Sequence, residues 1–192
     1  MANKIITISR EFGSGGRFIG EEVAKKLGMK YYDKDIISQI AEKLGFSKEY
    51  ISQNAELSPK KGLFAYALTG RDTTGKSVED MVYEAQRKVI LEIAENDSCV
   101  IIGRNADYIL KDRTDVINIF IHADMPEKVK RICRLYNVTE TEAVAMTADI
   151  DKRRMTNYRY YTDQKWGMAR NYTLTLNLSL IHISEPTRQE AI

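Results

Sequence analysis

The sequence predicts an α/β fold with a parallel sheet, and three observations lead to it. Short runs rich in β-branched residues alternate with segments in which apolar residues recur at helical spacing. A glycine-rich turn at residues 13–16 joins the first such run to the first such helix. The 192 residues, 43% of them hydrophobic, are enough for one compact domain with a single core.

Four segments are typical of strands. Residues 4–9 are almost continuously apolar and β-branched, which suits a central strand covered on both faces. Residues 98–103 form a second buried run, while residues 115–121 and 172–177 show alternating apolar positions. Because helical segments lie between most of these runs, we expect parallel pairing with right-handed crossovers.

Helical periodicity marks most of the intervening segments. Apolar residues of segment 17–27 share one face, and Gly28 follows as a C-cap. Asp33 is placed to cap a helix that ends at Gly45. Further helices are predicted at residues 48–53, from residue 78 onward, at 126–136 and at 140–157.

Composition excludes several classes of function. With 29 basic and 27 acidic residues, the net charge of +2 argues against a partner that is a nucleic-acid polymer. Cys99 and Cys133 lack the spacing of a metal site, so we expect two reduced thiols and no protein-bound metal cluster. No apolar run approaches the roughly 20 residues of a membrane span, and no N-terminal signal is recognisable. We therefore predict a cytoplasmic protein without membrane contact.

Two glycine loops compete for a role in phosphate binding. Residues 70–77, Gly-Arg-Asp-Thr-Thr-Gly-Lys-Ser, satisfy the P-loop pattern at every fixed position. A P-loop also needs a buried strand before it, and residues 63–68 lack β-branched side chains. Ser77 has a simpler interpretation as the N-cap of the helix that follows.

The first loop, residues 10–17, matches the pattern poorly but lies in the right place. It follows a buried strand and precedes a helix, so glycines and the helix N-terminus can meet an anion there. Aligned on the P-loop pattern, Gly15 takes the second glycine position, Gly16 the lysine position and Arg17 the hydroxyl position. An ordinary tight turn between strand and helix is the alternative interpretation.

Several segments together resemble the cytidylate kinase-like family, and the resemblance covers nearly all of residues 1–177. They are Ile-Ser-Arg-Glu-Phe-Gly-Ser-Gly-Gly-Arg at 8–17, Tyr-Tyr-Asp-Lys-Asp-Ile-Ile at 31–37, Val-Ile-Ile-Gly-Arg-Asn-Ala-Asp-Tyr-Ile-Leu at 100–110, Asp-Lys-Arg-Arg at 151–154 with Tyr160 and Tyr161, and Asn-Tyr-Thr-Leu-Thr-Leu-Asn at 171–177. The resemblance implies a P-loop kinase fold: a five-stranded parallel sheet flanked by helices, with a helical acceptor-binding insertion and an arginine-rich lid. It also favours the first glycine loop over residues 70–77.

The resemblance implies phosphoryl transfer from ATP, with Mg²⁺, to a nucleoside monophosphate, cytidylate being the namesake. Small nucleotides are then the partners; the sequence indicates no oligomeric state. The residues that would line the donor phosphates are Gly13, Ser14, Gly15, Gly16 and Arg17. The acceptor site would include Asp33 and Arg104, and the catalytic arginines would be Arg17, Arg153 and Arg154, with Arg159 a weaker candidate.

Two departures from the family pattern leave a second hypothesis open. Nucleotide kinases have a lysine where Gly16 stands and a hydroxyl where Arg17 stands. Arg17 is a candidate to supply the missing charge, and Ser14 or Asp33 to replace the Mg²⁺ ligand. The alternative is a nucleotide- or phosphate-binding regulatory protein without kinase turnover.

The last 15 residues do not continue the pattern. Residues 178–192 show neither strand alternation nor helical amphipathicity, so we interpret them as a non-native or truncated tail. The predicted organisation is a single kinase-like domain over residues 1–177 followed by this tail.

Overall fold

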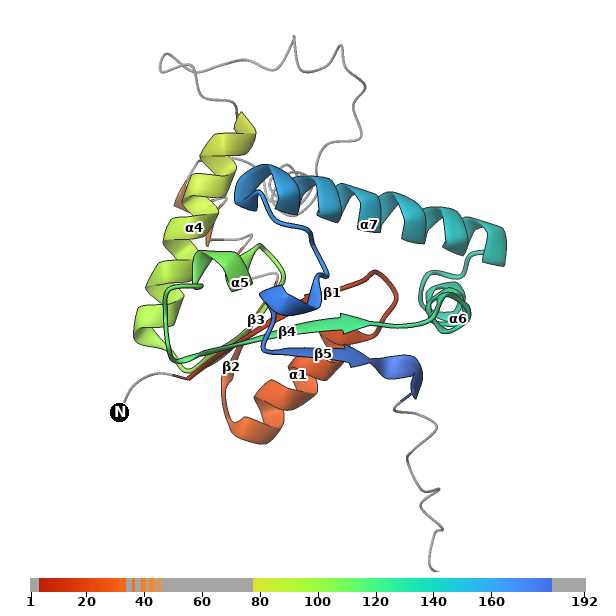
Figure 1. The fold of residues 1–192 in the computed structure, drawn as a ribbon, viewed down its shortest axis with the longest axis horizontal. Helices are drawn as coiled ribbons and strands as arrows, with labels where there is room; N and C mark the ends of the chain where they lie inside the picture. The colour runs from red at the N-terminus through yellow and green to blue at the C-terminus, as the bar shows by residue number, and fades with distance from the viewer. Residues whose placement is uncertain are drawn as a thin grey trace, which may run out of the picture.

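The predicted α/β fold is confirmed: five parallel strands form one sheet with helices on both faces (Figure 1). A computed structural model describes residues 4–33, 36, 39–40, 42–43, 45 and 78–180. The strand order is β2-β3-β1-β4-β5. The strands are β1 (Ile5–Arg10), β2 (Lys30–Tyr32), β3 (Cys99–Ile102), β4 (Val116–His122) and β5 (Leu174–Asn177).

The described helices include four long ones and two short ones. They are α1 (Gly16–Leu27), α4 (Val78–Asn96), α5 (Ala106–Ile109), α6 (Met125–Tyr136), α7 (Glu140–Thr162) and the 3₁₀ turn η2 (Ala169–Asn171). In Figure 1, α4, α5 and α7 lie on one side of the sheet and α1 on the other. None of the described helices combines the length and apolarity that crossing a membrane requires.

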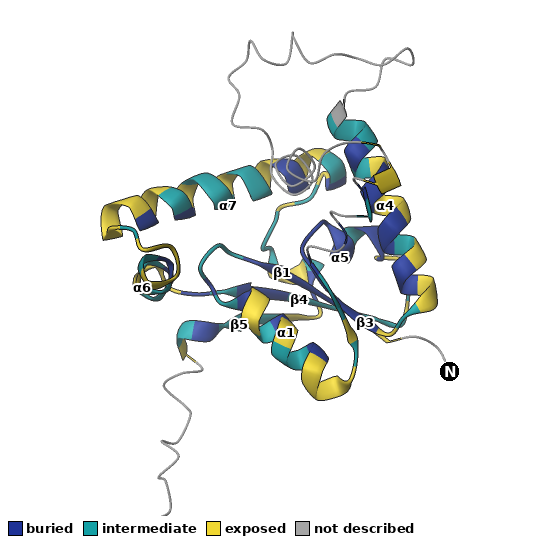
Figure 2. Cartoon of the chain, turned by 180° about the vertical axis from the view of Figure 1, so that it is seen from behind, coloured by how far each residue is buried: buried dark blue, intermediate teal, exposed yellow. Residues whose placement is uncertain are grey.

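Alternation along the central strands produces two separate cores. Ile5 and Ile101 point toward α4 and α5, whereas Ile6, Ile8 and Ile102 point toward α1. Each of these five side chains is at most 9% exposed. Because both faces of β1 and β3 are covered, these strands need an apolar residue at nearly every position, as their sequences show. Figure 2 shows the resulting buried centre of the sheet.

The sequence analysis missed three elements: the 3₁₀ turn η2, which has three residues, and two others. Strand β2 has only three residues, and α5 has one turn; both are too short to show a period. The helix α7 extends five residues beyond the predicted end at 157 and stops at Asp163, which adopts a left-handed conformation. The predicted helix at 48–53 and the glycine motif at 70–77 lie outside the described residues.

The chain just beyond β5 packs against the domain. Leu178 is buried in the core next to α1, and the backbone N–H of Asp124 donates to Ser179 Oγ at 2.7 Å. Residues 181–192 lie outside the described residues, so the assignment of a doubtful tail stays a prediction.

Candidate functional site

The glycine loop, residues 10–17, leads from the buried strand β1 into α1. Gly13 and Gly15 have φ of 76° and 89°, a conformation that residues with a Cβ rarely adopt. A Cβ on Gly13 would lie 2.7 Å from Ile132 Cδ1, and one on Gly16 would lie 2.7 Å from Arg10 Cβ. The loop can therefore take this path only with glycine at these places.

The loop presents backbone donors at the start of a helix. Within the described part of the chain, the backbone N–H groups of Gly13, Gly15 and Arg17 have no hydrogen-bond acceptor. Successive unsatisfied N–H groups at a helix N-terminus, with positive φ between them, form a concave site for an anion. No acidic residue lies in the first turn of α1, so nothing there competes with a phosphate.

Ser14 shapes the loop from inside. It is fully buried, and its Oγ donates to the Glu11 carbonyl at 2.9 Å and accepts from the Gly16 N–H at 3.4 Å. These two bonds engage the hydroxyl within the loop, so Ser14 does not suit the role of a Mg²⁺ ligand. The described residues contain no cluster of three or more metal-ligating side chains.

Arg17 and Asp33 meet at the outer end of the loop. Arg17 Nε lies 2.7 Å from Asp33 Oδ2, and their side chains are 54% and 8% exposed. Burial lowers the pKa of the Arg17 guanidinium, but Asp33 and Tyr31 outweigh burial and raise it overall. The residue assigned to the donor site and the one assigned to the acceptor site are thus joined by an ion pair.

Arg104 follows strand β3 and is held in an unusual conformation. Arg104 and Asn105 have φ of 63° and 54°, and both are buried. Gln86 Nε2 donates to the Arg104 carbonyl at 2.8 Å. Asn105 Nδ2 donates to Asn157 Oδ1 on α7 at 3.1 Å. Contacts from α4 and α7 therefore fix the backbone position from which the Arg104 side chain extends.

Three arginines line one small cavity at the carboxyl ends of β1 and β3, the edge where open α/β sheets bind ligands. Its volume is about 10 Å³, close to one water molecule. Its lining residues are Ser9, Arg10, Gly103, Arg104, Asn105, Arg154 and Trp166. A cavity surrounded by guanidinium groups favours an anionic oxygen.

A larger cleft of about 540 Å³ lies over the glycine loop. Its lining residues are Arg10, Glu11, Phe12, Gly13, Gly15, Gly16, Arg17, Phe18, Glu21, Arg131, Ile132, Leu135, Tyr136 and Arg154. Arg131 reaches over from α6, where its Nη1 donates to the Gly13 carbonyl. Arg10 and Arg154 line both this cleft and the small cavity.

The two predicted lid arginines, Arg153 and Arg154, have different surroundings. Arg154 Nη1 donates to the Arg10 carbonyl at 3.0 Å, so it lies directly on the glycine loop. Arg153 Nη1 lies 3.8 Å from Asp149, one turn away on α7. Arg159 lines a different cleft, together with Trp166 and Met168.

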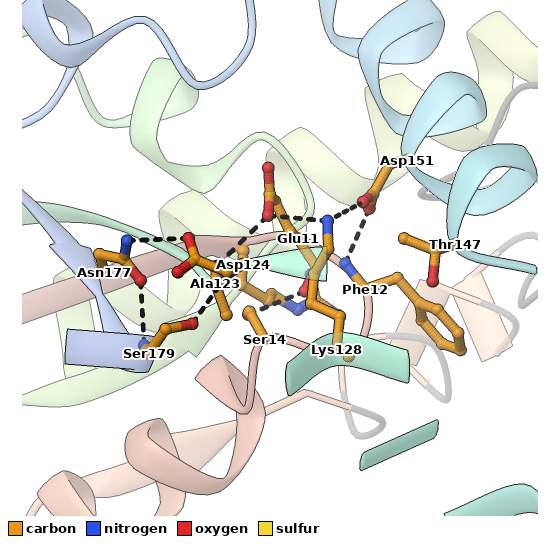
Figure 3. Close-up of polar contacts among 12 residues, drawn as sticks. Glu11, Phe12, Ser14, Ala123, Asp124, Lys128, Thr147, Asp151, Asn177 and Ser179 are labelled. Carbon is orange, nitrogen blue, oxygen red and sulfur yellow. Dashed lines mark hydrogen bonds and ion pairs between the residues drawn. The ribbon is translucent and has the colours of Figure 1, made fainter. Parts of the chain in front are cut away.

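A charged cluster that the sequence analysis missed joins the loop to α6 and α7 (Figure 3). Lys128 Nζ lies 2.9 Å from Glu11 Oε2 and 3.5 Å from Asp151 Oδ2, and Asp151 Oδ1 accepts from the Phe12 N–H at 2.7 Å. Burial raises the pKa of Asp151, opposed by Phe12, Arg154 and Lys128. A signal was available, since Lys128 precedes the buried Ile132 by four residues and shares its face of α6.

Known proteins resemble most of the chain. The sequence pattern of the cytidylate kinase-like family matches residues 5–180. A cytidylate kinase from Archaeoglobus fulgidus is 25% identical over 177 residues, which are 90% of this chain and 84% of that protein. An uncharacterized protein from Eubacterium ventriosum of known crystal structure is 26% identical, with a TM-score of 0.70, over 93% of this chain and 89% of its own. Shikimate kinase from Bacteroides thetaiotaomicron shares the fold, with 16% identity, a TM-score of 0.51 and coverage of 91% and 85%.

Proposed function

The chain belongs to the cytidylate kinase-like family, and we propose that it transfers a phosphoryl group from ATP to a nucleoside monophosphate, with CMP as the expected acceptor. One observation carries the proposal. The cleft over the glycine loop and the cavity beside Arg104 share two lining residues, Arg10 and Arg154. A donor phosphate chain in the cleft and an acceptor phosphate that places one oxygen in the cavity beside Arg104 would then meet between these two guanidinium groups.

The glycine loop fits the phosphates of ATP. The N–H groups of Gly13, Gly15 and Arg17 supply donors, and the N-terminus of α1 supplies partial positive charge. Neither side chain proposed as a Mg²⁺ ligand is available for that role. Ser14 is hydrogen-bonded within the loop, and Asp33 is paired with Arg17. We therefore expect Mg²⁺ to be held mainly by phosphate oxygens and water, as this ion permits.

Phosphoryl transfer suits the site because it needs positioning and positive charge more than a nucleophile on the protein. Arg104 would hold the acceptor phosphate, and Arg154 would contact the transferring group from α7. The glycine at position 16 favours the alternative of a nucleotide-binding regulatory protein without turnover. The cytoplasmic location and the exclusion of nucleic-acid polymers stay predictions.

A coupled assay of ADP release tests the proposal. Wild type is given ATP, Mg²⁺ and each common nucleoside monophosphate in turn, beside Arg104→Met, Arg17→Ala and Lys76→Ala. The matched control is Arg113→Met, because Arg113 pairs with Asp115 at the start of β4, away from the site. Melting temperatures of all variants separate loss of function from loss of fold.

We expect turnover with CMP that Arg104→Met and Arg17→Ala reduce and that Lys76→Ala and Arg113→Met leave intact. Loss with Lys76→Ala alone would assign the donor phosphates to residues 70–77 instead. A folded wild type that binds ATP and turns over no acceptor would favour the regulatory alternative.

A further inference from the structure

We infer that Arg10 is the catalytic cation of this protein, taking the place of the lysine that the P-loop pattern has at position 16. The inference rests on the proposed function, because it names the group that would contact the transferring phosphoryl group. In P-loop enzymes that lysine reaches the β- and γ-phosphates and neutralises charge as the group moves. This chain has glycine there, so the charge must come from another position.

The side chain of Arg10 fills the space into which a residue at position 16 would grow. A Cβ on Gly16 would lie 2.7 Å from Arg10 Cβ, 3.2 Å from Arg10 Cγ and 3.2 Å from Ile121 Cβ. The contact of 2.7 Å is shorter than real Cβ atoms essentially ever show, and the two of 3.2 Å are tighter than most real Cβ contacts. An arginine at position 10 and a lysine at position 16 therefore exclude each other. The two substitutions relative to the P-loop pattern, arginine for the first glycine and glycine for the lysine, are parts of one exchange.

Arg10 also stands where the two phosphate sites join. It is the last residue of β1, only 9% exposed, and it lines both the cleft over the glycine loop and the cavity beside Arg104. Its carbonyl accepts from Arg154 Nη1 at 3.0 Å, so α7 fixes its backbone. A group passing from a donor in the cleft to an acceptor at Arg104 would pass Arg10.

Arg17, the replacement suggested by the sequence, is placed less well. Its side chain is 54% exposed and pairs with Asp33 at 2.7 Å. It lines the cleft but does not line the cavity beside Arg104. Arg17 can thus contact the donor phosphates, whereas Arg10 borders both the donor and the acceptor sites.

In the phosphoryl transfer, Arg10 would supply only positive charge and hydrogen bonds. An oxygen of the acceptor phosphate forms a bond to the γ-phosphorus of ATP, and the bond from that phosphorus to the β–γ bridging oxygen breaks, releasing ADP. The guanidinium donates hydrogen bonds to the phosphoryl oxygens that carry the charge. Its planar fork can bind two phosphate oxygens in a fixed bidentate geometry, whereas a lysine ammonium acts as a compact point charge.

Four variants test the assignment: Arg10→Met, Arg10→Lys, Gly16→Lys, and the exchange variant that combines Arg10→Gly with Gly16→Lys. The control is Arg113→Met. The measurements are kcat for CMP phosphorylation, calorimetric affinities for ATP and for AMP, and the melting temperature. The titrations are made without Mg²⁺ and with CMP saturating the acceptor site, so that AMP binds at the donor site. Because AMP lacks the β- and γ-phosphates, a residue that contacts these phosphates then affects ATP binding alone.

We expect Arg10→Met to lower kcat roughly 100- to 1,000-fold, as loss of one transition-state donor does, and to weaken ATP but not AMP. Arg10→Lys should retain part of the activity. Gly16→Lys alone should be inactive because Arg10 occupies the space. The exchange variant should be at least about tenfold more active than Gly16→Lys or Arg10→Met, since it restores the P-loop arrangement. The exchange variant also keeps the test valid if Arg10→Met fails to fold.

The outcomes separate this inference from the proposed function. An active wild type whose Arg10→Met variant keeps its kcat would overturn the role of Arg10 and leave the kinase intact. A wild type without turnover would contradict the kinase proposal, and the ATP affinities would then test Arg10. An unchanged ATP affinity in Arg10→Met would overturn the contact between Arg10 and the phosphates. A loss of affinity for ATP but not for AMP would support that contact. A folded wild type that binds no ATP overturns both.

Discussion

The glycine loop and the segment at residues 103–107 follow the two central strands of the sheet, and they are built in different ways. The glycine loop depends on missing side chains, because a Cβ at Gly13 or Gly16 would collide with its surroundings. Segment 103–107 depends on buried polar side chains, those of Arg104, Asn105 and Asp107. Backbone N–H groups face the ligand space in the first region, and guanidinium and amide groups do so in the second.

Both regions are fastened to the same helix, α7, through different groups. The loop offers backbone: the Arg10 carbonyl and Phe12 N–H bind Arg154 and Asp151. Segment 103–107 offers side chains: Asn105 binds Asn157, and Asp107 Oδ2 accepts from Tyr158 OH at 2.8 Å. One rigid helix therefore sets the distance between the proposed donor and acceptor sites. The two regions should respond differently to substitution.

The largest expected effect comes from removing the cation that fastens the loop. Lys128→Met keeps most of the length of the side chain but leaves Glu11 and Asp151 facing each other without the Lys128 ammonium. Because Lys128 is only 7% exposed, we expect a loss of about 3 kcal/mol in the free energy of unfolding, near the lower end for a broken buried pair. Urea denaturation measures it.

Lys30→Met is the matched control for that substitution. Lys30 pairs with Asp97 at 2.7 Å, but its side chain is 64% exposed, so its removal should cost less than about 1 kcal/mol. Equal losses in Lys128→Met and Lys30→Met would show that the buried cluster does not fasten the loop.

The next largest effect tests whether the loop requires missing side chains. Gly13→Ala combines a positive φ with a contact of 2.7 Å to Ile132, so we expect a loss of about 2–3 kcal/mol together with weaker ATP binding. Gly28→Ala has a similar φ of 63° but no atom within 4 Å; it should cost only about 1–2 kcal/mol and leave ATP binding unchanged. Equal losses in the two variants would mean that backbone conformation, not space, fixes glycine in the loop.

The sequence predicts the first region better than the second for a physical reason. Glycine positions, the strand before them and the helix after them are local features, so residues 4–27 reveal the loop by themselves. Four of the five strands were predicted. Strands β1 and β3 were recognised from the continuous apolar runs that burial on two faces demands, and β4 and β5 from alternating apolar positions. The contacts of segment 103–107 join residues about 50 positions apart, and no periodicity encodes such pairs.

The choice between Arg10 and Arg17 shows the same limit. Alignment on the P-loop pattern places Arg17 next to the missing lysine and makes it the natural substitute. The conflict between Arg10 and a side chain at position 16 arises only when β1 and α1 are folded against each other. Lys128 lies between these cases, because a charged residue on the apolar face of α6 is visible in sequence, whereas its partner Glu11, 117 residues away, is not.

The smallest expected effect concerns the buried carboxyl group of segment 103–107 and depends on pH. Burial raises the pKa of Asp107 above its ordinary value of 3.8, opposed by hydrogen bonds from Tyr158 and Ser9. An acid with a higher pKa in the folded protein binds more protons there than in the unfolded chain, so stability falls as the pH rises above 3.8 through the folded value. Asp107→Asn removes this component because the amide does not titrate.

The free energy of unfolding of Asp107→Asn should therefore increase relative to that of wild type as the pH rises. The total relative increase is about 1.4 kcal/mol for each unit by which folding raises the pKa of Asp107. Tyr158→Phe should act in the opposite direction. Without the Tyr158 hydroxyl the pKa of Asp107 rises further, and the total loss of stability with rising pH becomes larger because it continues to a higher pH. Urea denaturation of the three proteins from about pH 4 to pH 8 measures both slopes. Parallel curves for wild type and Asp107→Asn would show that Asp107 titrates normally, and the second region would then owe its geometry to Asn105 and Asn157 alone.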